Sequence, residues 1–199
     1  MKAGIPPDQA SSRDGSEDMI APRVYLTGFM GSGKSTSGPL IAAQLGYRFL
    51  DLDAEVERIA GVTINELFAQ RGESKFRALE TAVLSQASDR ENVVVATGGG
   101  ALANEGNLLL AETSGTIVLL KLPAPVLAAR LSDPEGRPLL HDESGVPYTE
   151  AALVARIEDL LAKRERFYSH ADVVIEAASM TPEEVADAAV QALSAVTAG

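Results

Sequence analysis

The chain has 199 residues, of which 46% are hydrophobic, and this length and apolar content suit one globular domain with a continuous core. A net charge of −11 argues against a general affinity for nucleic acid or anionic lipid, because both need clustered Lys and Arg. The sequence has no cysteine, no secretory hydrophobic segment and no apolar run of about 20 residues, which excludes disulfides and predicts a cytoplasmic protein without a membrane span.

Residues 1–22 mix Pro, Ser, Gly and acidic residues without apolar periodicity, so we expect a flexible tail before one domain at residues 23–199. In that domain, short runs that are apolar throughout alternate with helical patterns, which is typical of a parallel sheet covered on both faces. The sequence therefore predicts a three-layer α/β/α sandwich with a five-stranded parallel sheet. The expected strands lie at residues 24–29, 47–53, 92–97, 116–122 and 172–176, and the expected helices at 34–45, 55–70, 73–88, 124–131, 150–168 and 181–195.

The first expected strand leads into GFMGSGKST, residues 28–36, which has the G-x4-G-K-S spacing of a phosphate-binding loop. Backbone N–H groups of such a loop form an anion site at the positive N-terminus of the next helix. We expect Lys34 to reach the β and γ phosphates of ATP, Ser35 to ligate Mg²⁺, and Thr36 to donate to the α phosphate. The alternative is a chance Gly-rich turn, which the full match between a strand and a helix disfavours. The expected ATP-binding residues of the loop are Gly31, Ser32, Gly33, Lys34, Ser35 and Thr36.

Asp51 and Asp53 stand two residues apart at the end of the second expected strand, where their side chains would share one face. Ligands of parallel α/β sheets bind beyond the carboxyl ends of the strands, so both carboxylates could face the phosphate loop. One could help to hold Mg²⁺, and the other could orient an acceptor hydroxyl as a hydrogen-bond acceptor or general base. The alternative is an Asp that caps the N-terminus of the next helix.

Two further segments carry features of an acceptor site. GESKFRALE, residues 72–80, places Arg77 one helical turn before Glu80, and Arg77 could recognise a carboxylate or simply form a salt bridge with Glu80. Three consecutive glycines follow the third expected strand and indicate close approach of the backbone to a ligand, although a tight turn is the alternative. Together these features predict a small, oxygenated, anionic acceptor. The glycines are Gly98, Gly99 and Gly100.

Taken in order and spacing, six segments resemble those of shikimate kinases: GFMGSGKST, FLDLDAEVE, GESKFRALE, VATGGGAL, GRPLL and RERFY. The resemblance covers about residues 23–196 and implies a P-loop NTPase fold like that of nucleoside monophosphate kinases. It implies that ATP phosphorylates the 3-hydroxyl of shikimate, giving shikimate 3-phosphate and ADP on the route to chorismate and aromatic amino acids. The family expectation is a monomer that uses Mg²⁺.

The resemblance also implies roles for residues of the acceptor site. Asp53 would hydrogen-bond the ring hydroxyls, Asp51 would help to hold the Mg²⁺ environment, and Arg77 would bind the shikimate carboxylate. Backbone N–H groups of Gly99 and its neighbours would contact the ring. The residues implied to shape and brace the pocket are Phe68, Phe76 and Glu80.

Three further parts of the chain resemble the family pattern. Arg164, four residues before a tyrosine, is implied as the second carboxylate ligand, although Arg166 stands where a proline is common and competes for the role. Residues 132–149 break the helical pattern with Pro, Gly and acidic residues, which predicts a mobile lid. Arg137 resembles the lid arginine that neutralises phosphate charge and Arg130 the arginine beside adenine, with surface solvation as the alternative for both.

We expect direct in-line transfer without a phosphoenzyme, with Lys34 and Arg137 stabilising the transferring group and Asp53 orienting the hydroxyl. The segment EAASMTPEE lacks a basic residue, so adenine recognition there would use backbone and apolar contacts. Two other functions stay open: a gluconate kinase or another small-molecule kinase of this fold, and a non-catalytic binding protein. The arginine pair, the Asp pair and the Gly triplet favour shikimate over the first. An intact set of Lys34, Ser35, Asp53 and Arg137 argues against the second.

Overall fold

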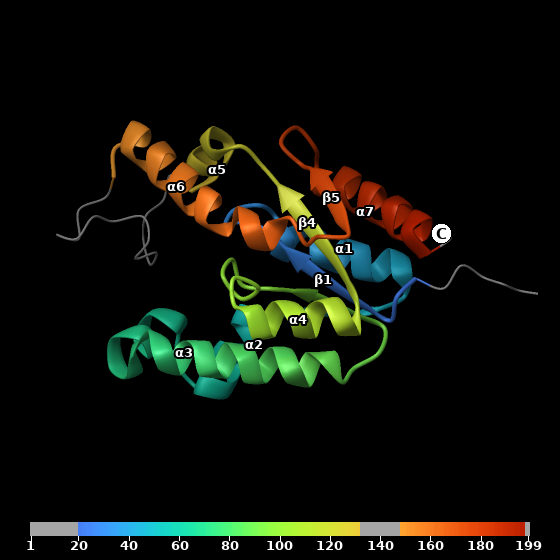
Figure 1. Cartoon of the computed structure of the whole chain (residues 1–199), viewed down its shortest axis with the longest axis horizontal. Helices are drawn as coiled ribbons and strands as arrows, with labels where there is room; N and C mark the ends of the chain where they lie inside the picture. Colours follow the sequence, from blue (N-terminus) through green and yellow to red (C-terminus); the bar gives the residue numbers. More distant parts are fainter. Residues whose placement is uncertain (1–19, 132–147, 198–199) are drawn as a thin grey trace, which may run out of the picture.

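The computed structural model describes residues 20–131 and 148–197, and its strands form one sheet (Figure 1). The sheet has five parallel strands in the order β2-β3-β1-β4-β5. Each strand lies close to its predicted place, so the predicted parallel sheet is confirmed. The strands are β1 (Arg23–Thr27), β2 (Arg48–Asp51), β3 (Val93–Ala96), β4 (Thr116–Lys121) and β5 (Val173–Glu176).

Helices connect the strands, and several begin at residues whose side chains cap them. Thr63 and Glu66 form a capping box at the start of α3, and the Thr149 hydroxyl accepts from the backbone of Ala152 at the start of α6. The helices are α1 (Lys34–Leu45), α2 (Leu52–Ala60), α3 (Ile64–Ser88), α4 (Glu105–Ser114), α5 (Ala124–Arg130), α6 (Glu150–Tyr168) and α7 (Pro182–Thr197).

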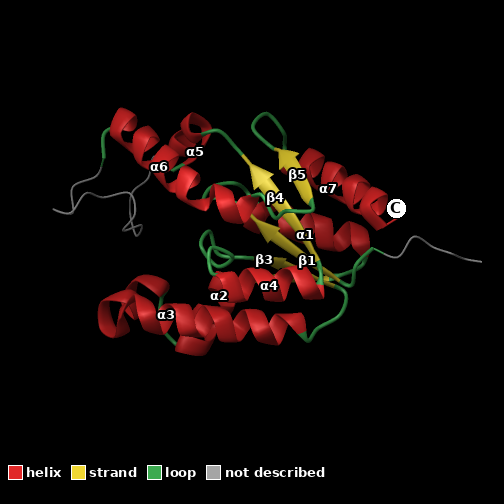
Figure 2. Cartoon of the chain, in the orientation of Figure 1, coloured by secondary structure: helices red, strands yellow, loops and turns green. Residues whose placement is uncertain are grey.

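Two buried cores lie on opposite faces of the sheet, which confirms the three-layer prediction. Val24 and Leu26 of β1 belong to the core that also contains side chains of α1, α5, α6 and α7. Tyr25, between them, points to the other face and belongs to the core shared with α2, α3 and α4. Figure 2 shows α3 and α4 on one side of the strands and α1 and α7 on the other.

Three local predictions are wrong or incomplete. The helix expected at 55–70 is divided, because Gly61 ends α2 in a left-handed conformation and the Thr63 cap starts α3. Asp51 and Asp53 do not share a strand face, since the Asp51 carboxylate caps α2 and the helix begins at Leu52. No helix was predicted at α4, which follows the glycine triplet and packs against α3 and β4.

Several predictions fall largely outside the described residues, including the lid at 132–149 with Arg137 and most of the tail at 1–22. Ile20 is described and packs against the core, and its carbonyl accepts a 3.1 Å hydrogen bond from the Tyr47 hydroxyl. Among the helices that the structure describes, none has the length and apolar character needed to cross a membrane. The single domain, the monomer and the cytoplasmic location stay predictions.

Candidate active site

The phosphate-binding loop joins β1 to α1, and Lys34 is the first residue of that helix. Gly33 precedes it with φ 99°, a left-handed conformation that glycine adopts without strain. The Lys34 ammonium donates 2.9 Å hydrogen bonds to the carbonyls of Gly28 and Phe29, and Lys34 is only 9% exposed. Burial lowers the pKa of Lys34 to about 8, against the attraction of Asp53 and Asp51. The loop therefore holds a buried amine that a phosphate anion would favour in its charged form.

Asp51 connects the phosphate-binding loop to α2. Its Oδ2 atom accepts a 2.6 Å hydrogen bond from the Ser35 hydroxyl, and its Oδ1 atom accepts from the backbone N–H groups of Asp53 and Ala54. The capping alternative is thus confirmed. The Ser35 hydroxyl and the Asp51 carboxylate also place two oxygen atoms side by side. Mg²⁺ prefers oxygen ligands of this kind together with phosphate and water. In the described ranges, no group of three or more His, Cys, Asp or Glu side chains is arranged around a metal position.

Asp53 lies in the first turn of α2 and lines the cavity above the loop. Burial raises the pKa of its carboxyl group, the Asp51 charge raises it further, and the nearby Lys34 ammonium opposes the shift. A carboxylate with a raised pKa accepts a proton more readily than an ordinary exposed one. This arrangement suits a group that orients a hydroxyl and takes its proton.

The three glycines after β3 lie close to other groups of the site. A methyl group added at Gly98 would stand 2.6 Å from Asp53 Oδ1, and one at Gly100 would stand 3.3 Å from both terminal nitrogens of Arg77. At Gly99 it would approach the backbone nitrogen of Met30 at 3.3 Å. None of the three has φ in the left-handed region, so close approach, rather than an unusual backbone angle, explains the triplet.

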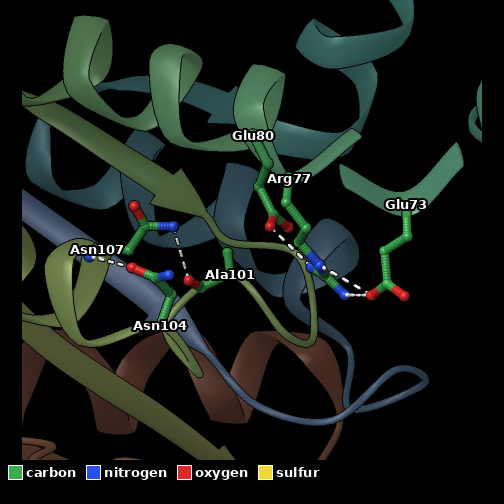
Figure 3. A network of polar contacts seen from close by, with 6 residues as sticks. All are labelled: Glu73, Arg77, Glu80, Ala101, Asn104 and Asn107. Carbon is green, nitrogen blue, oxygen red and sulfur yellow. Dashed lines mark hydrogen bonds and ion pairs between the residues drawn. The ribbon is translucent and has the colours of Figure 1, made fainter. Parts of the chain in front are cut away.

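Arg77 forms ion pairs with two carboxylates on α3 (Figure 3). Its Nη1 atom donates to Glu80 Oε2 at 2.8 Å, and its Nε and Nη2 atoms both donate to Glu73 Oε1 at 3.3 Å. The Glu80 side chain is 2% exposed and the Glu73 side chain 66%. Burial raises the pKa of Glu80, and Arg77 opposes this. The salt-bridge alternative is therefore present, and Arg77 also lines the cavity.

Arg164 and Arg166 of α6 are placed differently. The Arg164 guanidinium lies 5.0 Å from the ring centre of Phe29, in the phosphate-binding loop, and lines the cavity. Its Nη1 atom is buried and forms no hydrogen bond to any described residue. Arg166 instead lies over the ring of Phe167 and does not line the cavity. The spacing of four residues before a tyrosine thus selected Arg164, which is the one of the two arginines that lines the cavity.

One cavity of about 1050 Å³ joins these features. Arg130 contacts the phosphate loop at its rim, where Nη1 donates to the Gly31 carbonyl at 3.3 Å. Asp51 does not line the cavity, but it accepts a hydrogen bond from Ser35, which does line it. The predicted site residues that line the cavity are Gly31, Ser32, Gly33, Lys34, Ser35, Thr36, Asp53, Phe68, Phe76, Arg77, Glu80, Gly98, Gly99, Gly100, Arg130 and Arg164.

Some residues of the site were missed in the sequence. Glu73 contacts Arg77 from the previous helical turn, and an i,i+4 Glu–Arg search would have found it. Asn107 is buried in α4 and donates to the Ala101 carbonyl at 2.9 Å, which ties α4 to the glycine loop. Asn104, directly before Glu105, caps α4 and was an available signal for this helix.

A family model for shikimate kinase matches residues 30–194. Shikimate kinase of Chlorobium chlorochromatii is 46% identical over 153 residues, which cover 77% of this chain and 80% of the relative. That of Caldanaerobacter subterraneus subsp. tengcongensis is 40% identical over 169 residues, covering 85% and 94%.

Solved structures agree with this match. Shikimate kinase from Acinetobacter baumannii in complex with shikimate superposes with a TM-score of 0.78 at 35% identity, covering 86% of this chain and 92% of that one. A gluconokinase from Sinorhizobium meliloti has a TM-score of 0.51 at 18% identity, which shows a shared fold alone. Sequence and structure together lead to one conclusion: the chain belongs to the shikimate kinase family.

Proposed function

We propose that this enzyme transfers the γ-phosphoryl group of ATP to the 3-hydroxyl of shikimate, yielding shikimate 3-phosphate and ADP in the route to aromatic amino acids. One observation carries the proposal. Lys34 of the phosphate-binding loop and Asp53, whose pKa is raised, line the same cavity as Arg77 and Arg164. A kinase for an anionic alcohol needs these three elements: a triphosphate site, a group to orient the hydroxyl, and cations for the acceptor's charge.

The nucleotide would occupy the end of the cavity formed by the phosphate-binding loop and the start of α7. Backbone N–H groups of the loop and the Lys34 ammonium would bind the phosphates, with Thr36 near the α phosphate. The chemistry of the donors at Ser35 and Asp51 fits Mg²⁺, which would supply charge neutralisation on the phosphates. Apolar contacts to adenine are available from a group of cavity-lining residues: Ala177, Met180, Pro182 and Val185.

The acceptor would occupy the end of the cavity beside the glycine triplet. Arg77 and Arg164 would bind its carboxylate and so decide which hydroxyl faces the phosphate loop. Asp53 would accept the hydrogen bond of that hydroxyl and take its proton as transfer proceeds, since its raised pKa suits a general base. Backbone N–H groups around Gly99 would contact the ring.

Transfer would be direct and in line, because positioning and charge neutralisation account for most of the catalysis of phosphoryl transfer. Lys34 would hold the transferring group, and Asp53 would hold the attacking oxygen. Arg137 lies outside the described residues, and its part in neutralising phosphate charge stays a prediction from the resemblance. The predicted lid would exclude water and limit ATP hydrolysis.

The proposal is tested by ADP release with ATP and Mg²⁺, comparing shikimate, quinate and gluconate as acceptors, with Asp53→Asn as the control. We expect release with shikimate that the Asp53→Asn variant lacks, and NMR of the product should place the phosphate on the 3-oxygen. A response to gluconate would indicate another small-molecule kinase. Nucleotide binding without acceptor-dependent release would favour a non-catalytic binding protein.

A further inference from the structure

We propose that Glu73 competes with the acceptor's carboxylate for the Arg77 guanidinium and thereby lowers the affinity of the site for its acceptor. The inference rests on the proposed function and names a residue that sets acceptor affinity. The two carboxylates that contact Arg77 differ in burial and distance. Glu80 is buried and close, whereas Glu73 is exposed and more distant (Figure 3).

The two carboxylates contact different nitrogen atoms of the Arg77 guanidinium. Glu73 Oε1 accepts from Nε and Nη2, the two parallel N–H groups on one edge of the Arg77 side chain. Carboxylates bind arginine bidentately through such a pair of N–H groups. Glu80 takes only Nη1. Glu73 therefore occupies an edge of Arg77 on which an incoming carboxylate could bind with both oxygens.

An incoming carboxylate can replace Glu73 on Arg77 at a low cost in free energy. Both of its hydrogen bonds are 3.3 Å long, whereas hydrogen bonds between charged groups are usually about 2.7–2.9 Å. The Glu73 side chain is 66% exposed, so its carboxylate would regain water when released. It directly follows Gly72, whose φ of 75° and ψ of 167° interrupt the helix. The short contact to buried Glu80 would continue to hold Arg77 in place.

The negative charge of Glu73 also opposes the binding of an anionic acceptor. Glu73 and Arg77 line the cavity together with Arg164, so the Glu73 charge lies beside the place where two arginines would bind an anion. An acceptor carboxylate must displace this charge or bind next to it, and both possibilities weaken its binding. The sign of the effect is therefore the same for either position of the bound acceptor.

The test compares Glu73→Gln and Glu73→Ala with the wild-type enzyme. We expect the KM for shikimate to fall by about 1.4- to fivefold in Glu73→Gln, the range measured for exposed ion pairs, and at least as far in Glu73→Ala, which also leaves that edge of the guanidinium free. The KM for ATP should not change, and kcat should stay within about twofold. Asp159→Asn is the matched control, because Asp159 is an exposed partner of an i,i+4 pair with Lys163 and lines no part of the cavity.

A second acceptor separates charge competition from a merely structural role. The methyl ester of shikimate lacks the negative charge, so its KM should not respond to Glu73→Gln. An unchanged or higher KM for shikimate in both variants, or an equal fall for the ester, would overturn the inference. Absence of shikimate-dependent ADP release by the wild-type enzyme would overturn the proposed function as well. A normal wild-type rate with an unaltered KM in the variants would overturn the inference alone.

Discussion

Asp53 packs so closely against Gly98 that a methyl group at residue 98 would stand 2.6 Å from Asp53 Oδ1 and 3.0 Å from Glu80 Oε1. Carbon and oxygen atoms do not lie this close without one of them moving. The absence of a side chain at residue 98 thus leaves the space that the Asp53 carboxylate occupies. Under the proposed function, the loop after β3 would therefore help to orient the acceptor.

Gly98→Ala should lower kcat by about 10- to 100-fold, because a displacement of about 1 Å in a positioning group can reduce the rate by that much. Steady-state ADP release measures the effect, and circular dichroism reports whether the fold is retained. Gly106→Ala is the control, since Gly106 lies in α4 without a left-handed φ and an added methyl group would meet the end of the Asn104 side chain, at 3.3 Å and outside the cavity. Wild-type kcat in Gly98→Ala would contradict the assigned role of Asp53.

Arg77→Ala should reduce both stability and acceptor binding. It leaves the Glu80 carboxylate buried without its cation, and we expect the free energy of unfolding to fall by about 2–3 kcal/mol, less than for a fully buried pair because Arg77 is 42% exposed. The double variant Arg77→Ala, Glu80→Gln should recover part of this loss in urea denaturation. It should not recover the KM for shikimate. A double variant no more stable than Arg77→Ala would show that Glu80 does not need its counter-charge.

The sequence predicts the sheet and the phosphate-binding loop well because both depend on short, local patterns. The apolar runs that form β1 to β5 need no knowledge of distant residues, and the spacing within GFMGSGKST is by itself the signature of a phosphate-binding loop. The Asp51–Asp53 pair shows the limit of this reasoning. The sequence at these two residues is compatible both with a continuing strand and with the start of a helix. In the structure, the Asp51 carboxylate accepts hydrogen bonds from two backbone N–H groups, and the helix therefore starts here.

Other parts of the site depend on contacts between segments far apart in the chain. Nothing near Gly98 in the sequence indicates that the three glycines lie against Asp53, the backbone of Met30 and Arg77 in turn. The stacking of Arg164 on Phe29 joins residues of α6 and the first loop, and neither segment implies it alone. The spacing of Glu73 and Arg77 is visible in the sequence but does not indicate a role in the site, since an exposed i,i+4 ion pair on a helix usually has no function.

Asp53→Asn should lower kcat at least 100-fold while stabilising the protein at pH 7. The pKa of Asp53 is raised in the folded protein, so on acidification the folded state takes up this proton before the unfolded state does. Above that pH range the ionised Asp53 carboxylate therefore destabilises the folded wild-type protein. This destabilisation fades as the pH falls toward 3.8, the ordinary pKa of the carboxyl group. Chemical denaturation of both proteins between pH 7 and pH 4 should show the advantage of the variant shrinking. An advantage that grows on acidification would mean that the pKa is lowered instead.

Asp51 has two separable roles, because its Oδ1 atom caps α2 and its Oδ2 atom binds the Ser35 hydroxyl. Asp51→Asn retains an oxygen for the cap, so its free energy of unfolding should change by less than about 0.5 kcal/mol, whereas Asp51→Ala should lose about 0.5–2 kcal/mol. Both variants lose the negative charge beside Ser35, and both should need about tenfold more Mg²⁺ for half-maximal ADP release at saturating ATP. Thermal unfolding and a Mg²⁺ titration of each variant give the two readouts independently. Equal Mg²⁺ requirements in the wild type and Asp51→Asn would remove Asp51 from the metal environment and leave it as the cap of α2.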